Sequence, residues 1–283
     1  SSVYRFCFMK GPPYLLHINR RILSLKVVQF PGGRSAVIAN CTFASNYAKR
    51  GAGIYNTRAS SELTNCIFSG NEAIDYGGGI YTDNCELTLT NCTLFGNSVK
   101  SLYEGGGGGM YNHWTSAGIF NSILWGNTSG SGENQIQNYF STTRIFYSDI
   151  EGSGGSGGSW DTNLGTDEGG NIDANPLFYD PANGDFRLTL GSPCIDTGTN
   201  GEAPATDFEG ESRPFDGDYD GSAITDMGAD EWCTGGPVAP IPESGTILLM
   251  GLGVLGLGGI VLWRIRRGSR GLAGGATTPK AFM

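Results

Sequence analysis

A seven-residue motif recurs along the chain, and its regular spacing limits the possible folds more than any other feature. Three clear copies begin at Asn40, Asn65 and Asn91 and read NCTFASN, NCIFSGN and NCTLFGN. Two weaker copies, NSILWGN and YSDIEGS, begin at Asn121 and Tyr147, so successive copies start 25, 26, 30 and 26 residues apart. A repeat of this length indicates stacked supersecondary units, each of which packs against the next.

The residue types of the repeat favour strands over helices. Each unit is rich in Gly, Asn, Ser and Thr, and β-branched or aromatic side chains mark its apolar positions. In the third unit Leu87 and Leu89 stand at odd-numbered positions and alternate with threonines. Cys92 and Leu94 also alternate with a threonine, but they stand at even-numbered positions. The chain must therefore bend near Asn91 to keep both pairs directed inward. We predict an all-β fold, a single-stranded parallel β-helix with five recognisable coils over residues 40–153.

Stacking the coils in this register places equivalent side chains on top of one another. The first predicted inner ladder consists of Cys41, Cys66, Cys92, Ser122 and Ser148. The second consists of Phe43, Phe68, Leu94, Leu124 and Ile150. A column of asparagines at a bend, whose stacked amides can bond to one another, consists of Asn46, Asn71, Asn97 and Asn127.

A second phrase, Gly-Ile-Tyr or Gly-Met-Tyr, lies between the copies and is centred on Ile54, Ile80 and Met110. The third phrase lies four residues farther from its preceding motif than the second does. The extra residues therefore fall within residues 100–109. An insertion confined to one loop leaves the core ladders intact, and such loops usually carry binding in a solenoid.

The charge of the chain is unevenly distributed. The formal net charge is −9, but residues 1–39 contain six basic residues and residues 246–283 contain five, with no acidic residue in either segment. Residues 40–245 thus hold seven basic residues against all 27 acidic ones, a net charge of −20. Such a surface repels nucleic acid and polyanionic glycans and suits cations or neutral partners. We therefore expect no nucleic-acid binding.

The seven cysteines form no metal-binding pattern. No C-x-x-C occurs, and the two histidines have no partner at ligand spacing. Cys194 and Cys233 flank the C-terminal part of residues 40–245. We hypothesise a disulfide between them, which would form in an oxidising compartment.

Residues 154–234 carry a series of short motifs after the coils. They are NPLFYDPANGDFRL from Asn175, GSPCID from Gly191, RP at Arg213 and DMGADE from Asp226. In this order, following N-C-T-F coils, they resemble the choice-of-anchor Q family over about residues 40–232. The resemblance implies a bacterial surface protein with a right-handed parallel β-helix, related in pattern to polymorphic outer-membrane-protein repeats.

An acidic loop within this segment matches the first half of a calcium-binding loop. Asp216, Asp218 and Asp220 with Gly221 read D-x-D-x-D-G, which places hard oxygen ligands on alternate residues. The twelfth position is Met227 instead of the bidentate Glu of an EF-hand. Two interpretations remain open at this stage, a structural Ca²⁺ site and a solvated acidic turn.

The C-terminal residues predict a membrane anchor. Residues 235–245 form a linker rich in Pro and Gly, and residues 246–263 are 18 residues without a charge, just long enough to span a bilayer. Arginines follow in residues 264–283, so the positive-inside rule places the C-terminus in the cytoplasm and the β-helix outside.

Residues 1–39 are either an N-terminal cap or a truncated region.

The residues before the apolar run resemble a sorting signal. Pro242, Glu243 and Ser244, followed by the apolar run and the arginines, are similar to the PEP-CTERM signal, in which Pro stands where this chain has Ser244. This resemblance implies processing by a sortase-type enzyme at the bacterial cell envelope. A plain single-pass transmembrane anchor explains the same residues.

Two functions remain as alternatives. A surface-anchored adhesion or glycan-binding module would use exposed aromatic side chains as a stacking platform, for which the candidates are Tyr103, Trp114, Trp125 and Tyr139. The alternative interpretation of these four residues is that they are ordinary aromatic side chains at the edges of the coils. A polysaccharide lyase or glycoside hydrolase would need convergent carboxylates on outward strand positions, and Asp149 with Glu151 is the best placed pair. We favour the binding module, because no motif resembles a pectate lyase or polygalacturonase site. The alternative for Asp149 and Glu151 is a solvated acidic edge.

Overall fold

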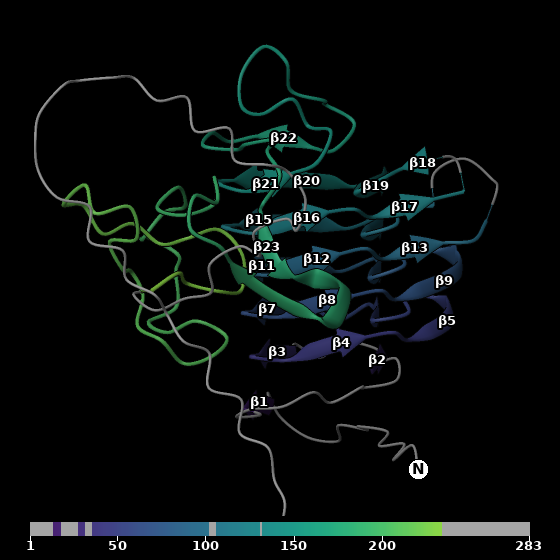
Figure 1. Ribbon diagram of the computed structural model, residues 1–283. Helices are drawn as coiled ribbons and strands as arrows, with labels where there is room; N and C mark the ends of the chain where they lie inside the picture. Colours follow the sequence, from purple (N-terminus) through teal and green to yellow (C-terminus); the bar gives the residue numbers. More distant parts are fainter. Residues whose placement is uncertain (1–13, 18–27, 32–35, 102–105, 131, 234–283) are drawn as a thin grey trace, which may run out of the picture. The chain divides into compact units, whose positions relative to one another are not determined.

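The chain folds into a parallel β-solenoid of about five turns (Figure 1). The computed structural model describes residues 14–17, 28–31, 36–101, 106–130 and 132–233, all of which belong to one compact unit. These described residues contain strands and one short 3-10 helix but no α-helix. The predicted all-β solenoid is therefore confirmed.

The strands of successive turns form four sheets, here called A to D, which are parallel except for the antiparallel pair of β17 and β18 in sheet D. Sheet A contains β1 (Tyr14–His17), β3 (Ala36–Ala39), β7 (Ser61–Thr64), β11 (Glu86–Thr90), β15 (Ser116–Phe120), β20 (Thr142–Phe146) and β22 (Thr166–Asp167). Sheet B contains β2 (Val28–Pro31), β6 (Ile54–Thr57), β10 (Ile80–Asp83), β14 (Met110–His113) and β19 (Ile136–Tyr139). Sheet C contains β4 (Thr42–Ala44), β8 (Ile67–Ser69), β12 (Thr93–Phe95), β16 (Ile123–Trp125) and β21 (Asp149–Ile150). Sheet D contains β5 (Tyr47–Arg50), β9 (Glu72–Tyr76), β13 (Ser98–Val99), β17 (Thr128–Ser129) and β18 (Gly132–Glu133).

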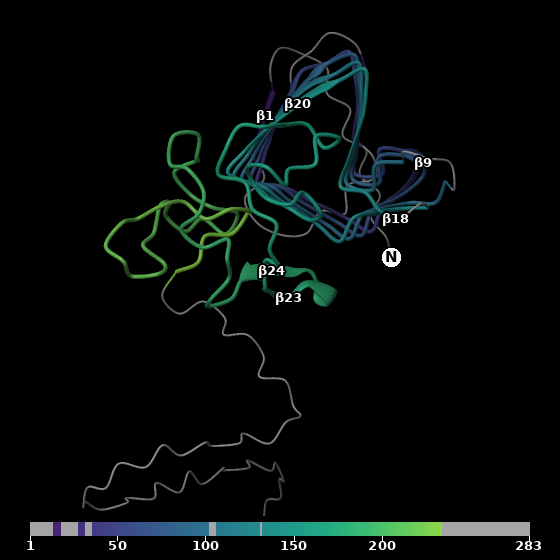
Figure 2. The same cartoon turned by 90° about the horizontal axis from the view of Figure 1, so that it is seen from above.

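Viewed along the solenoid axis, the strands of successive turns superpose (Figure 2). Both predicted inner ladders are confirmed. The small ladder from Cys41 to Ser148 and the apolar ladder from Phe43 to Ile150 are buried throughout, and Phe43 and Phe68 stack with their ring centroids 4.7 Å apart. Pairing in exact register, such as Phe68 beside Leu94, lets each coil cover the apolar face of the next.

The predicted asparagine ladder is also present. Nδ2 of Asn46 donates to Oδ1 of Asn71 (2.9 Å), and the same bond links Asn71 to Asn97 and Asn97 to Asn127 (2.8 Å each). Each acceptor oxygen takes a second bond, from the backbone N–H of the asparagine that donates to it. Gln135 ends the ladder by accepting from Nδ2 of Asn127 (2.6 Å). The buried amides are therefore satisfied by one another, as buried polar groups require.

The insertion lies where the spacing predicts it. Lys100 donates its N–H to Ala73 in the preceding coil (2.9 Å), and Gly77 donates to Gly106 (2.9 Å), so the register resumes at Gly106. The extra residues therefore fall between Lys100 and Gly106.

Within residues 1–39, β1 pairs with β3 and β2 pairs with β6, so these two strands continue sheets A and B.

Residues 175–233, here called the covering segment, pack against the outer face of sheet C, whereas β22 before them continues sheet A. The covering segment contains a hairpin of β23 (Phe178–Asp180) and β24 (Asp185–Leu188), joined by the 3-10 helix η1 (Pro181–Asn183). Two apolar clusters join it to the solenoid. One contains Ile123, Leu188, Cys194, Ile195, Met227 and Trp232, and the other contains Ile67, Phe186 and Ala229. Outward side chains of sheet C such as Ile67 and Ile123 are thus buried beneath this segment.

The first asparagine of the second, third and fourth repeats attaches this segment to the solenoid. Asn65, Asn91 and Asn121 lie at the bend between sheets A and C with φ of 49°, 49° and 47°, a left-handed conformation that Asn adopts more readily than most residues. Their side-chain amides donate to carbonyl oxygens of Thr206 (2.7 Å), Asp226 (2.9 Å) and Thr199 (2.8 Å), respectively. One residue type therefore makes the bend and binds the covering segment.

The D-M-G-A-D-E motif surrounds a buried arginine. Arg213 donates from its guanidinium to the carbonyl oxygens of Asp226 (3.3 Å) and Gly228 (3.1 Å), and its Nε lies 3.5 Å from Glu231. Burial raises the pKa of Asp226 to about 8 and that of Glu231 to about 7, and the neighbouring guanidinium opposes both shifts. These motif residues therefore hold the covering segment together.

The anchor and sorting predictions, residues 235–283 with Pro242, Glu243 and Ser244, lie outside the described residues. Within the described ranges no helix is long and apolar enough to cross a membrane.

We expect the substitution Asn97→Ala to lower the free energy of unfolding by about 2–4 kcal/mol, because it leaves several buried groups of the ladder without partners. Asn97 accepts from the backbone and side chain of Asn71 and donates to Phe68 and Asn127. Urea denaturation followed by circular dichroism measures the change. The control Asn163→Ala removes an exposed amide and should cost less than about 0.5 kcal/mol. Equal costs would show that the ladder does not stabilise the fold.

Candidate functional site

One outward-facing residue per coil lies at the bend between sheets B and A. This corner column consists of Arg58, Asn84, Trp114 and Phe140, all exposed, with φ between 49° and 54°. Backbone N–H groups of the first three donate to the next coil over 2.9–3.0 Å, so the column is in direct register. Successive corner residues therefore lie about 4.8 Å apart along the solenoid axis.

Exposed aromatic rings gather at the last two positions of this column. Trp114 and Phe140 are 56% and 65% exposed, and their rings stack with centroids 4.6 Å apart and an interplanar angle of 14°. Tyr139, 47% exposed, meets the Phe140 ring edge-on at 4.6 Å, and His113 stacks on Tyr139 at 5.2 Å. We call these four residues, His113, Trp114, Tyr139 and Phe140, the aromatic corner.

The backbone of the aromatic corner is unfavourable for its side chains. A left-handed conformation costs a non-glycine residue roughly 1–2 kcal/mol, and less for Asn, which occupies the corner at Asn84. Trp114 and Phe140 bear this cost although their rings are exposed and add little to the core. Strained backbone and contiguous exposed apolar surface both occur preferentially at binding sites.

Polar side chains border the aromatic corner on the side of the preceding coil. Nδ1 of His113 lies 2.6 Å from Oδ1 of Asp83, which holds both side chains in place. Asn84 and Glu86 are exposed beside this pair. The surface thus combines flat apolar rings with fixed hydrogen-bonding groups, as sites for polar ligands commonly do.

The structure brings together two of the four predicted platform residues. Trp114 and Tyr139 meet at the aromatic corner, whereas Trp125 packs against the cluster beneath the covering segment and is not available for a platform. Tyr103 lies outside the described residues. Phe140 was missed because its coil lacks the Gly-Ile-Tyr phrase. Trp114 stands four residues after Met110, and Met110 pairs with Ile136. The equivalent position in the next coil is therefore four residues after Ile136, which is Phe140.

The predicted carboxylate pair does not form an open site. Asp149 points outward from sheet C, but the covering segment buries it completely, and the Cys194 thiol donates to its Oδ2 (3.3 Å). Oε2 of Glu151 accepts from the N–H of Gly126 (2.6 Å) and from Nε2 of Gln135 (2.8 Å). The prediction that both carboxylates stand on an accessible strand face is therefore wrong for Asp149.

Burial raises the pKa of Asp149 to about 7 from an ordinary value of 3.8. The unfolded carboxyl group loses its proton near pH 4 and the folded one near pH 7, so stability falls as the pH rises between these values. Such a shift corresponds to about 4 kcal/mol once the pH exceeds both pKa values.

We therefore expect Asp149→Asn to be more stable than the parent chain at pH 8 and to differ little at pH 4. Asn preserves the shape of the side chain but carries no charge at either pH. Denaturant unfolding at a series of pH values measures the difference, with Glu62→Gln, an exposed carboxyl on sheet A, as the control. A pH-independent difference for Asp149→Asn would contradict this assignment.

Three carboxylates converge beside the acidic loop. Oxygen atoms of Asp196, Asp216 and Asp218 lie within 4.8 Å of one another. Oδ1 of Asp216 is buried and accepts no hydrogen bond, whereas Oδ1 of Asp220 accepts the N–H of Ser222 (2.7 Å). The cluster thus contains two of the three predicted ligands, with Asp196 in place of Asp220. An orphaned buried oxygen in a set of hard oxygen ligands fits a metal ion.

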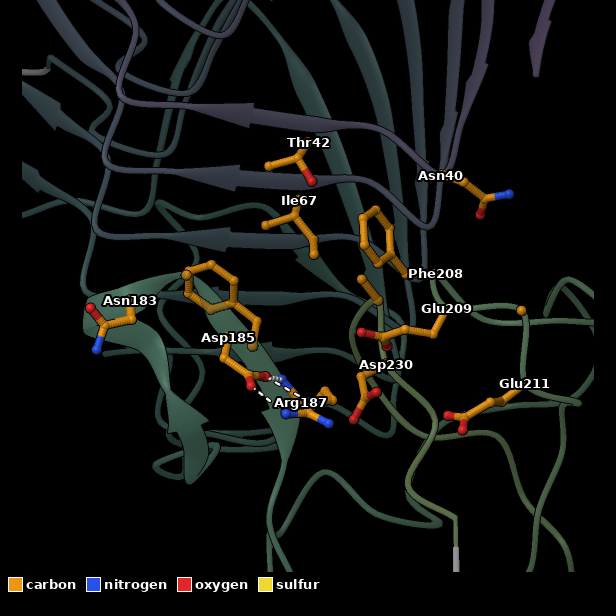
Figure 3. Close-up of a pocket in the computed structure, with 14 residues that line it drawn as sticks. Asn40, Thr42, Ile67, Asn183, Asp185, Arg187, Phe208, Glu209, Glu211 and Asp230 are labelled. Carbon is orange, nitrogen blue, oxygen red and sulfur yellow. Dashed lines mark hydrogen bonds and ion pairs between the residues drawn. The ribbon is translucent and has the colours of Figure 1, made fainter. Parts of the chain in front are cut away.

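A second acidic group lines a cleft of about 630 Å³ between sheet C and the covering segment (Figure 3). Glu209, Glu211 and Asp230 line the cleft, and their carboxylate oxygens lie within 4.8 Å of one another and of the buried Asp207 carboxylate. Burial raises the pKa of both Glu209 and Asp230. Arg187 donates from Nε to Oδ1 of Asp185 (2.8 Å) on the opposite side of the cleft. Asp207, Glu209 and Glu211 alternate along one short stretch, whereas Asp230 stands in the D-M-G-A-D-E motif. Only the fold brings these carboxylates together, so sequence reasoning missed the cluster.

The predicted disulfide is not formed. Cys194 and Cys233 are both free thiols, and Cys194 is completely buried. Its thiol is directed at Asp149 in the last coil. The position of Cys194 in the sequence suggested a bridge, but its packing makes it part of the interface between the covering segment and the solenoid.

Comparison with known proteins gives no relative from which a function can be transferred. No known protein family, curated protein or solved structure matches this chain.

Proposed function

We propose that this chain is an extracellular, surface-anchored β-solenoid that binds glycans at its aromatic corner and acts as an adhesion or recognition module. The exposed, stacked rings of Trp114 and Phe140 are the observation that supports this proposal most directly. Sugar rings have apolar faces that pack on flat aromatic surfaces, while their hydroxyl groups need polar partners at the edge of the surface. The aromatic corner offers both.

The surroundings of the site support a solenoid that acts by binding. The outer face of sheet C is covered by the covering segment, whereas the corner between sheets B and A presents an exposed aromatic surface. The best enzyme candidate from the sequence, Asp149 with Glu151, is directed into buried or bonded positions. We therefore prefer a binding module to a polysaccharide lyase or hydrolase.

The proposed location follows from the sequence. The choice-of-anchor Q resemblance, the apolar run of residues 246–263 and the arginines after it support an envelope protein whose solenoid lies outside the cytoplasm. The similarity of Pro242, Glu243 and Ser244 to a sorting signal supports processing by a sortase-type enzyme. The net charge of −20 in residues 40–245 suits neutral glycans.

We expect Trp114→Asn and Phe140→Asn each to weaken glycan binding at least tenfold, or about 1.4 kcal/mol. Asn removes the ring but adopts the left-handed backbone readily, so the fold should be preserved. Isothermal titration of the full chain with a panel of neutral oligosaccharides measures the affinity.

The matched control is Tyr47→Asn, which removes an aromatic ring that is 59% exposed on sheet D. It should leave binding unchanged. The proposal fails if no glycan in the panel binds, or if the control weakens binding as much as Trp114→Asn does.

We also propose that the cluster of Asp196, Asp216 and Asp218 holds a structural Ca²⁺. The ion would supply the missing partner of Asp216 Oδ1 and would reduce repulsion among three close carboxylates. At about 100 times its Kd, bound Ca²⁺ should stabilise the fold by about 2.7 kcal/mol, which raises the Tm by roughly 5–10 °C.

Calorimetry with Ca²⁺ and with a chelator tests this expectation. Asp216→Asn should abolish the rise in Tm, whereas Asp220→Asn should preserve it, because Asp220 lies outside the cluster. A rise that both variants retain would place the ion elsewhere.

A further inference from the structure

The corner column has a gap at the level of Asn84. Arg58, Trp114 and Phe140 place long planar groups at their levels, whereas Asn84 has a short side chain. All four residues share the same backbone conformation and direct register, so their side chains leave the solenoid at equivalent points. The levels of Arg58 and Trp114 are therefore about 9.6 Å apart, with only Asn84 between them.

One face of the Trp114 indole is directed toward this gap. The Phe140 ring stacks at 4.6 Å on the side of the following coil, so it covers the opposite face of the indole. The remaining face is directed toward the level of Asn84. An indole is the largest flat apolar surface that a protein side chain offers, and a ligand that packs on it gains the most from leaving water.

Hydrogen-bonding groups lie at the level of this gap. Asn84 offers both a donor and an acceptor, and Asp83 is fixed in position by its 2.6 Å contact with His113. Glu86 is exposed two residues farther along the same coil. Groups of this kind suit neighbouring hydroxyl groups, and the two carboxylates disfavour an anionic ligand.

We propose that the ligand is a neutral saccharide, one sugar ring of which lies in the gap at Asn84, stacked on Trp114 and bonded by Asn84 and Asp83. This inference rests on the proposed function of the aromatic corner and names the class of glycan and its position there. Arg58 closes the gap on the other side, where its planar guanidinium can lie against the sugar.

The test fills the gap without changing the aromatic corner. In Asn84→Leu an aliphatic side chain covers the free face of the indole and offers no hydrogen bond. The chain already places a leucine in the same backbone conformation at Leu177, with φ of 51°, so the variant should fold. In the matched variant Asn84→Gly the gap stays open and only the amide is lost.

Titration of the full chain with neutral and with uronic-acid oligosaccharides gives separate outcomes. We expect Asn84→Leu to weaken neutral oligosaccharide binding at least tenfold, as Trp114→Asn does, and Asn84→Gly to weaken it no more than a few fold. Circular dichroism and Tm establish that each variant is folded. If Asn84→Leu binds like the parent chain while Trp114→Asn does not, the inference is wrong and the proposed function stands.

Two further results would overturn the inference. Preferential binding of the uronic-acid oligosaccharides would refute the neutral class, although the aromatic corner would remain the site. Binding that Trp114→Asn, Phe140→Asn and Asn84→Leu all leave unchanged would refute the proposed function as well, since none of these side chains would then touch the ligand.

Discussion

Direct register between neighbouring coils is the constraint on which the rest of this structure depends. Parallel strands place residue on residue, so that Phe43, Phe68 and Leu94 form one column and the asparagine amides of another column bond to each other. Each column satisfies its own buried groups only when the register is kept. A slip by one residue would direct the apolar side chains outward and leave the amides without partners.

The same register determines what the surface can present. Every outward position recurs at about 4.8 Å, so neighbouring coils bring their corner residues into contact whatever the sequence distance between them. Trp114 and Phe140 are 26 residues apart and stack at 4.6 Å. A flat rigid platform therefore needs only two aromatic substitutions in equivalent positions, and the solenoid supplies the geometry that an irregular loop would have to create.

The sequence was informative wherever the repeat applies. The ladders, the asparagine column and the place of the insertion follow from counting residues, because in a solenoid sequence spacing determines contact. The covering segment has no repeat, and there the predictions failed. Asp149 and Trp125 were expected at the surface, but nothing in their own coils shows that the covering segment packs against them. Asp196 likewise ends the GSPCID motif and joins Asp216 of the acidic loop, a contact that neither motif indicates by itself.

The residues that occupy the bends between sheets determine both how the covering segment is attached and where the aromatic corner lies. Between sheets A and C, Asn65, Asn91 and Asn121 adopt the left-handed conformation readily and bind the segment. Between sheets B and A, the same conformation is occupied at two levels by large rings that bind nothing buried. Asn would fit those bends at lower cost, as Asn84 does one coil earlier. Stability alone does not explain the rings, whereas the proposed glycan ligand, which needs their exposed faces, would explain them.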